Sequence, residues 1–410
     1  MCSERTAARL HGAWKRRYSV LGILFCAYVL CYMDRMIMAS ALPFVAESFK
    51  LSAREMGYVL SAFFVGYALM QVPGGLLADR FGIRVVTTVC ITWWSIMTAL
   101  TALAQSVGAL LLIRVLFGVG EGPFPATAAK AISIWFPSRE IGRANGFQLA
   151  ATALGATVAP LIATTMIEDW GWRYAFVVLL PGGLVLAILA WRNVRGRPAG
   201  AQRYRHYEGI QANLQLYLST PALMWCACCL FLFNVVAWGL MNWLPTYLLQ
   251  ARGLQVREMG AVIAVTNLAA GIGYPLGGYL SDRHFANSPR IPILFSLLAS
   301  AVLIYLAASA ASPRSAAVWF ILTFLVNGVA GAVIFTTPFM LVPSRAVGGA
   351  FGFVNFAGQL AGVVSPLLVG ATLTVTAGNF DRVLYCLAGN CVVAAVAACR
   401  IRLPDDRPRS

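Results

Sequence analysis

The stretch Gly74-Gly-Leu-Leu-Ala-Asp79-Arg80 recurs as Gly277-Gly-Tyr-Leu-Ser-Asp282-Arg283, so the two copies begin 203 residues apart in a chain of 410. A second pair agrees with the first. Leu154-Gly-Ala-Thr-Val-Ala-Pro160-Leu corresponds to Leu360-Ala-Gly-Val-Val-Ser-Pro366-Leu, 206 residues later. Both offsets are close to half the chain length, which indicates two copies of one structural unit.

The composition places these units in a membrane. Hydrophobic residues make up 60% of the chain and charged residues only 11%, whereas soluble domains carry about 25% charged residues. Apolar runs long enough to cross a bilayer, about 20 residues of helix, recur from Tyr18 to Arg400. The sequence predicts an all-α membrane protein with twelve transmembrane helices in two pseudo-symmetric six-helix bundles. The expected helices are 18–44, 56–78, 85–104, 107–136, 144–168, 174–192, 222–249, 259–281, 291–310, 316–343, 347–376 and 382–400.

The basic residues predict the orientation of these helices. The net charge is +16, and the arginines gather before the first span and in the middle loop, as the positive-inside rule requires of cytoplasmic segments. This distribution argues for membrane topology and against nucleic-acid binding. The expected parts are a cytoplasmic N-terminal segment 1–17, a first bundle 18–192, a basic cytoplasmic linker 193–221, a second bundle 222–400 and a cytoplasmic tail 401–410. No removable signal peptide is expected.

Two adjacent charges, Asp34 and Arg35, interrupt the first apolar run. An ionisable side chain near the bilayer centre costs at least about 2.5–3.5 kcal/mol, so such residues face a partner or a wet cavity and mark functional sites. Internal repeats with charges at this depth are typical of secondary transporters, which bind substrate where two rocking halves meet.

Several motifs carry a resemblance to a known family. They are Tyr32-Met-Asp34-Arg35, Pro73-Gly-Gly-Leu-Leu-Ala-Asp79-Arg80-Phe-Gly, Arg114-x6-Glu121-Gly-Pro-x-Pro125, Trp135-Phe-Pro137 with Gly142-Arg143-Ala144, Trp243-Leu-Pro-Thr-Tyr247 and Asn355-Phe-x-Gly-Gln359. Over nearly its whole length the chain resembles the major facilitator superfamily and, more narrowly, the anion:cation symporter family. The resemblance implies a transporter of the bacterial inner membrane that imports a sugar acid or another organic anion with protons.

The charged residues have the chemistry for this function. Arg35 keeps its charge and matches a carboxylate with two parallel hydrogen bonds. Asp34 and Glu121 are candidate proton carriers, since burial and a nearby arginine act in opposite directions on a carboxyl group. Arg114 lies two helical turns before Glu121 and could neutralise either acid. The alternative is a structural salt-bridge cluster with no role in transport.

Uncharged residues at helical spacing complete the expected substrate site. Tyr67 and Asn355 stand at positions where the family contacts substrate, and Gln71 and Gln359 follow each of them by one turn. Asn242 belongs to a polar stripe with Asn234 and Trp238 that could instead join helices. Thr152 stands where sugar-acid members tend to carry glutamine, and Ala332, Ile334 and Phe335 stand where those members carry a small polar pair and a tryptophan. These departures favour a less hydroxylated carboxylate.

The repeated acidic-basic pairs are expected to control conformation. Asp79 with Arg80, and Asp282 with Arg283, lie at cytoplasmic helix ends, where charges can latch neighbouring helices. Lys130, near the cytoplasmic end of its helix, either draws an anion or extends its ammonium group to the interface.

The sequence thus predicts a proton-coupled importer of organic anions, and the alternative is a drug or metabolite exporter of the same superfamily. Arg35 argues against a cation exporter. A transporter-like sensor would favour an added soluble domain, and no nucleophile motif or histidine cluster indicates an enzyme. The expected partners are a small organic anion, protons and the lipid bilayer, without nucleic acid, metal or cofactor, and the expected state is a monomer.

Overall fold

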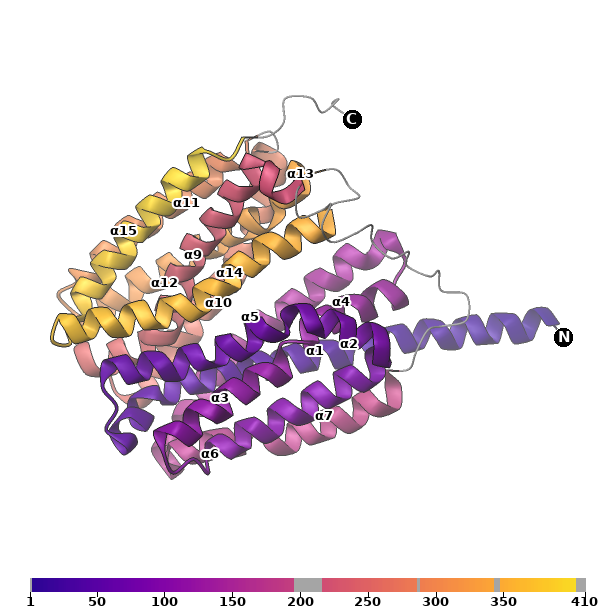
Figure 1. Ribbon diagram of the computed structural model, residues 1–410, viewed down its shortest axis with the longest axis horizontal. Helices are drawn as coiled ribbons and strands as arrows, with labels where there is room; N and C mark the ends of the chain where they lie inside the picture. The colour runs from indigo at the N-terminus through magenta and orange to yellow at the C-terminus, as the bar shows by residue number, and fades with distance from the viewer. Residues whose placement is uncertain (1, 195–215, 286–287, 343–346, 403–410) are drawn as a thin grey trace. The chain divides into compact units, whose positions relative to one another are not determined.

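The computed structural model describes residues 2–194, 216–285, 288–342 and 347–402, and these residues form helices without strands (Figure 1). The expected linker 193–221 and tail 401–410 fall largely outside the described residues. The helices are α1 (Cys2–Phe49), α2 (Ala53–Thr101), α3 (Val107–Glu121), α4 (Phe124–Trp135), α5 (Ser138–Trp170), α6 (Trp172–Val177), α7 (Leu180–Asn193), α9 (Pro221–Thr246), the π-helix η1 (Tyr247–Ala251), α10 (Val256–His284), α11 (Arg290–Ala308), α12 (Pro313–Thr336), α13 (Pro338–Leu341), α14 (Val347–Val375) and α15 (Phe380–Cys399).

Eleven of the described helical segments are long and apolar enough to cross a membrane. The expected span 56–78 and all but the last three residues of the expected span 85–104 lie within α2, which bends at Gly82, where φ is 81° and ψ is 158°. A positive φ of this size favours glycine, because any Cβ atom would clash with the backbone. The expected span 107–136 is divided into α3 and α4, since Pro123 has no N–H to continue the hydrogen-bond ladder.

The chain forms two compact units. Unit 1 contains residues 1–41 and 62–204, and unit 2 contains residues 42–61 and 205–410. The turn between α1 and α2 therefore belongs to unit 2, where the Ser61 hydroxyl donates a hydrogen bond to the Val363 carbonyl at 2.8 Å. Helix α2 begins with a capping box in this turn. The Ser52 N–H and hydroxyl both donate to the Glu55 carboxylate at 2.8 Å, which holds the pKa of Glu55 below its usual range.

Each unit contains one helix crossing so close that it requires glycine on both helices. In unit 1 a Cβ atom on Gly66 of α2 would lie 2.1 Å from the Val115 carbonyl oxygen, and one on Gly118 of α3 would lie 2.1 Å from that of Phe63. Unit 2 repeats the crossing between α10 and α12. A Cβ atom on Gly273 would lie 2.2 Å from the Leu325 oxygen, and one on Gly328 would lie 2.4 Å from the Ala270 oxygen. Small residues at such contacts let helix backbones approach in membranes.

We expect Gly118→Ala to lower the stability of the protein by about 1–3 kcal/mol, because its methyl group would overlap backbone atoms of α2. Thermal unfolding of the purified protein in detergent measures the effect. Gly108→Ala on the same helix is the matched control, since a Cβ atom there meets nothing within 4 Å. Equal melting temperatures for the two variants would contradict the prediction.

Candidate functional site

The two charges of the first span are buried in unit 1. Asp34 is 1% exposed and Arg35 is 7% exposed, both on α1. Glu121, the last residue of α3, is fully buried and completes the group. Because α3 ends here, at the break before Pro123, the carboxylate of Glu121 projects from a helix terminus beside α1.

Arg35 and Glu121 form a buried ion pair. The Arg35 Nε donates to the Glu121 Oε1 at 2.7 Å, and the Arg35 Nη2 donates to the same oxygen. The thiol of Cys31, one turn before Arg35, also donates to Oε1 at 3.0 Å. The second carboxylate oxygen, Oε2, is buried and accepts no hydrogen bond from the described residues. Three donors thus converge on one oxygen, while the other has no hydrogen-bond partner among the described residues.

Aromatic rings enclose the guanidinium group of Arg35. Its central carbon lies 5.0 Å from the ring centre of Tyr32, 4.8 Å from that of Phe63 and 4.6 Å from that of Tyr67. These distances are typical of cation–π contacts, which gain strength where water is excluded. The rings thus help to stabilise the cation in the apolar interior. The predicted substrate residue Tyr67 therefore contacts Arg35, together with Phe63, whose role the sequence did not indicate.

Asp34 and Arg114 lie near this pair without joining it. Neither carboxylate oxygen of Asp34 accepts a hydrogen bond from the described residues, and Thr98, Glu121 and Arg114 are its polar neighbours. The Arg114 guanidinium carbon lies 4.8 Å from the ring centre of Phe117, and its Nε is buried without a partner in the described chain. Arg114 is thus close enough to interact with both acids, but the structure describes an ion pair only between Arg35 and Glu121 at this site.

The uncharged candidates divide between the units. In unit 1 the Thr152 hydroxyl donates to the Leu149 carbonyl of its own helix at 2.7 Å, and the buried Gln71 Nε2 has no partner in the described chain. In unit 2 the Nδ2 of Asn242 and the Oε1 of Gln359 are likewise unpartnered, within the same described ranges. Asn355 is partly exposed on α14.

Other residues considered from the sequence have packing contacts in unit 2. The Asn234 Nδ2 donates to the Gly358 carbonyl at 3.0 Å, and so joins α9 to α14. Ile334 is fully buried in the hydrophobic core that α9, α12 and α15 share. The polar stripe of Asn234, Trp238 and Asn242 on α9 therefore contributes at least one contact between helices. This is the structural alternative to substrate binding that the sequence left open for the stripe.

The two acidic-basic motifs differ in their partners. Lys130 of α4 binds the Asp79 carboxylate at 2.5 Å and the Ala78 carbonyl at 2.7 Å. This contact connects α4 to α2, a role that the sequence did not predict for Lys130. Arg80 packs over the ring of Phe81, and Arg283 packs over that of Tyr279. Asp282 is exposed and has no ion pair among the described residues.

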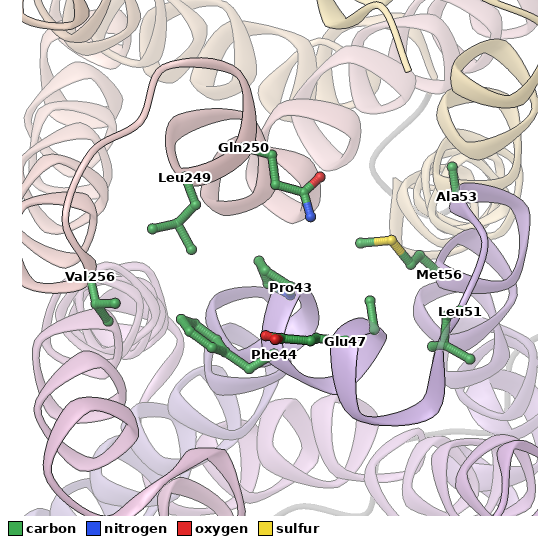
Figure 2. Close-up of a pocket in the computed structure, with 10 residues that line it drawn as sticks. Pro43, Phe44, Glu47, Leu51, Ala53, Met56, Leu249, Gln250 and Val256 are labelled. Atoms are coloured by element: carbon green, nitrogen blue, oxygen red, sulfur yellow. The ribbon is translucent and has the colours of Figure 1, made fainter. Parts of the chain in front are cut away.

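A separate cavity of about 520 Å³ lies in unit 2, between the α1–α2 turn and the residues around η1. Figure 2 shows Glu47 of α1 and Gln250 of η1 on its walls. Glu47 is the one charged residue among the ten that line it. This cavity does not contain the arginine that an anion would need, and the candidate anion site remains the group around Arg35.

Long apolar helices in two units, a repeated glycine crossing and a buried ion pair are the features of a polytopic membrane protein. The chain belongs to the Major Facilitator Superfamily, whose family model matches residues 24–408. It is 31% identical to a hexuronate transporter of Bacillus subtilis (strain 168), covering 95% of this chain and 96% of the relative. It is also 30% identical to a probable sulfoacetate transporter of Cupriavidus necator, covering 90% and 89%. These relatives are named as transporters and not as enzymes.

Solved structures show the same fold. A bacterial homolog of the human lysosomal transporter Spinster, in an inward-facing and unoccupied conformation, matches with a TM-score of 0.83 and 20% identity, covering 95% of this chain and 99% of that one. A D-xylose-proton symporter matches with a TM-score of 0.81 and 14% identity, covering 94% and 98%. The predicted fold class and superfamily are therefore confirmed.

We expect Arg35→Met to destabilise the protein strongly, by about 3–5 kcal/mol, because it leaves the Glu121 carboxylate buried without its partner. The double variant Arg35→Met with Glu121→Gln removes both charges and should recover much of the loss. Melting temperatures of wild type, both single variants and the double variant measure the coupling. If the double variant is no more stable than Arg35→Met, the loss of stability in Arg35→Met does not come from the unpaired Glu121 carboxylate.

We expect Lys130→Gln to slow transport with little effect on substrate affinity or stability, since the Lys130–Asp79 pair is partly exposed and such pairs contribute at most about 1 kcal/mol. Turnover and affinity in proteoliposomes, measured separately, distinguish these effects. Asp282→Asn is the comparison in the second repeat, and it should slow turnover less than Asp79→Asn does. If Asp282→Asn slows turnover more than Asp79→Asn does, the contact between Lys130 and Asp79 is not what makes the first motif important for turnover.

Proposed function

We propose that this transporter carries an organic anion, a sugar acid or another carboxylate, into the cell together with protons by alternating access. The observation that carries the proposal is the buried Arg35–Glu121 pair. A buried arginine must keep a counter-ion, so Arg35 can leave Glu121 only when another anion, such as a substrate carboxylate, takes its place. The names of the relatives support the substrate class, because hexuronate and sulfoacetate are both small organic anions.

The exchange of partners links the anion to the proton. A proton that binds Glu121 at the Oε2 atom, which has no partner in the described chain, removes the negative charge and releases Arg35. Arg35 then binds the substrate carboxylate, and the surrounding rings of Tyr32, Phe63 and Tyr67 keep water from competing. Asp34 is buried beside Glu121 and Arg114, and its carboxylate accepts no hydrogen bond in the described part of the chain, so it is the second candidate carrier. Loss of the proton on the cytoplasmic side returns Arg35 to Glu121 and expels the anion.

The remaining expectations belong to the same proposal. Bundles 18–192 and 222–400 are the two moving halves, joined by the cytoplasmic linker 193–221, and both termini face the cytoplasm of a bacterium. Tyr67, Gln71 and Thr152 from the first half would contact substrate together with Asn242, Asn355 and Gln359 from the second. Asp79, Arg80, Asp282 and Arg283 control the change of state, and Arg114 balances charge beside the acids. One chain forms the complete pathway.

A thermal-shift screen tests the substrate class. We expect one or more carboxylates in a panel of hexuronates, aldonates, simple carboxylates and organic cations to raise the melting temperature. Arg35→Gln should abolish this shift, whereas Arg400→Gln, an exposed arginine at the end of α15, should preserve it. Stabilisation by cations alone, unchanged in Arg35→Gln, would favour the exporter.

Uptake into proteoliposomes tests the coupling. We expect Glu121→Gln to lose accumulation driven by an inside-alkaline pH gradient, because the glutamine cannot release a proton. Exchange of labelled for unlabelled anion at equal pH on both sides needs no net proton movement and should survive. Full gradient-driven accumulation by Glu121→Gln would remove Glu121 from the proton pathway.

A further inference from the structure

Cys31 is a neighbour of the Arg35–Glu121 pair that the proposed function does not use. It lies one helical turn before Arg35 on α1 and is 2% exposed. Its thiol donates to the Glu121 Oε1 at 3.0 Å, the same oxygen that accepts from the Arg35 Nε at 2.7 Å. The thiol and the guanidinium group therefore hold this oxygen from two sides.

The hydrogen bond has a definite effect on the carboxylate. A donor to an ionised carboxylate favours the ionised form, and a protonated thiol is a weak donor of this kind. All three donors to Glu121 act on Oε1, and Oε2 is left without one among the described residues. The arrangement orients the carboxyl group so that Oε1 faces Arg35 and Oε2 is left for a further partner.

The other charged and titratable groups near Glu121 come from three helices. They are Asp34 and Arg35 with Cys31 on α1, Tyr67 and Cys90 on α2, and Arg114 on α3. Of these neighbours, Arg35 and Cys31 make the described hydrogen bonds to Glu121. Cys90 is a buried thiol of the same surroundings with no hydrogen bond in the described chain, and so provides a natural comparison.

We propose that Cys31 is a positioning residue of the coupling site, whose thiol orients Glu121 toward Arg35 and sets the pH at which Glu121 exchanges its proton. The inference rests on the proposed proton-carrying role of Glu121. In the step concerned, one proton from solution binds Oε2, the ion pair with Arg35 breaks, and Cys31 keeps its own proton throughout. No covalent bond to sulfur forms.

Infrared titration of the purified protein tests the inference without any substrate. The carbonyl stretch of the protonated Glu121 carboxyl is identified as the band that is missing in Glu121→Gln. This band grows as the pH falls, and the pH at which it reaches half its full height is the titration midpoint. We expect Cys31→Ala to raise this midpoint by about 0.5–1 pH unit, the effect of losing one ordinary hydrogen bond to the ionised form. Cys31→Ser keeps a donor, and its midpoint should equal that of wild type or lie below it. Cys90→Ala should leave the midpoint unchanged.

The pair of variants at Cys31 separates hydrogen bonding from packing. Alanine and serine are both smaller than cysteine, so a purely structural role predicts that they shift the midpoint together, and that result would overturn the inference. Equal midpoints in wild type and Cys31→Ala would also overturn it. If Cys31→Ala does not fold, Cys31→Ser decides alone, because a midpoint above that of wild type contradicts the role of the donor.

The titration also separates this inference from the proposed function. If wild type and Glu121→Gln show the same infrared titration, Glu121 does not exchange a proton, and both proposals fail. If the Glu121 band titrates but does not move in Cys31→Ala, the inference about Cys31 fails alone.

Discussion

The buried contact between Arg35 and Glu121 imposes the constraint on which the rest of the site depends. Each charge alone in an apolar interior would cost several kcal/mol, and their attraction repays this cost only while they remain together. Neither group can change its partner unless the other is neutralised at the same time. In the cycle that we propose, a substrate carboxylate and a proton satisfy this condition, one for each member of the pair. The same electrostatics that stabilises the resting protein thus links the two movements in the proposed cycle.

The fold supplies the geometry that this pair requires. Gly118 brings α3 against α2 one turn before Glu121, and the break at Pro123 ends α3 at the carboxylate itself. Phe63 and Tyr67, on the facing side of the same crossing, place their rings against Arg35. Backbone packing, helix termination and aromatic contact therefore act on the same few side chains, and a change in any of them would displace the ion pair.

The two repeats share their packing and differ in their chemistry. The close glycine crossing appears in both units, at Gly118 in one and Gly328 in the other. The buried charges lie in unit 1, while the candidates of unit 2 are amides such as Asn355. Even the shared acidic motif has diverged, because Asp79 has the ammonium group of Lys130 as a partner and Asp282 has no described one. The two repeats thus share contacts that hold their helices together and differ at their polar positions.

The sequence by itself determined the fold class, the superfamily and the position of the key charges, because apolar length, internal offsets and intramembrane charges are local features of the chain. It named Asp34, Arg35, Arg114 and Glu121 as the charged candidates and Tyr67 as an uncharged one, and the structure brings all five together in unit 1. The partners within that group depend on how side chains from different helices meet, and spacing along one helix does not specify this. Tertiary structure alone decided that Glu121 pairs with Arg35 while Arg114 packs on Phe117, that Cys31 donates to the same oxygen, and that Lys130 binds Asp79.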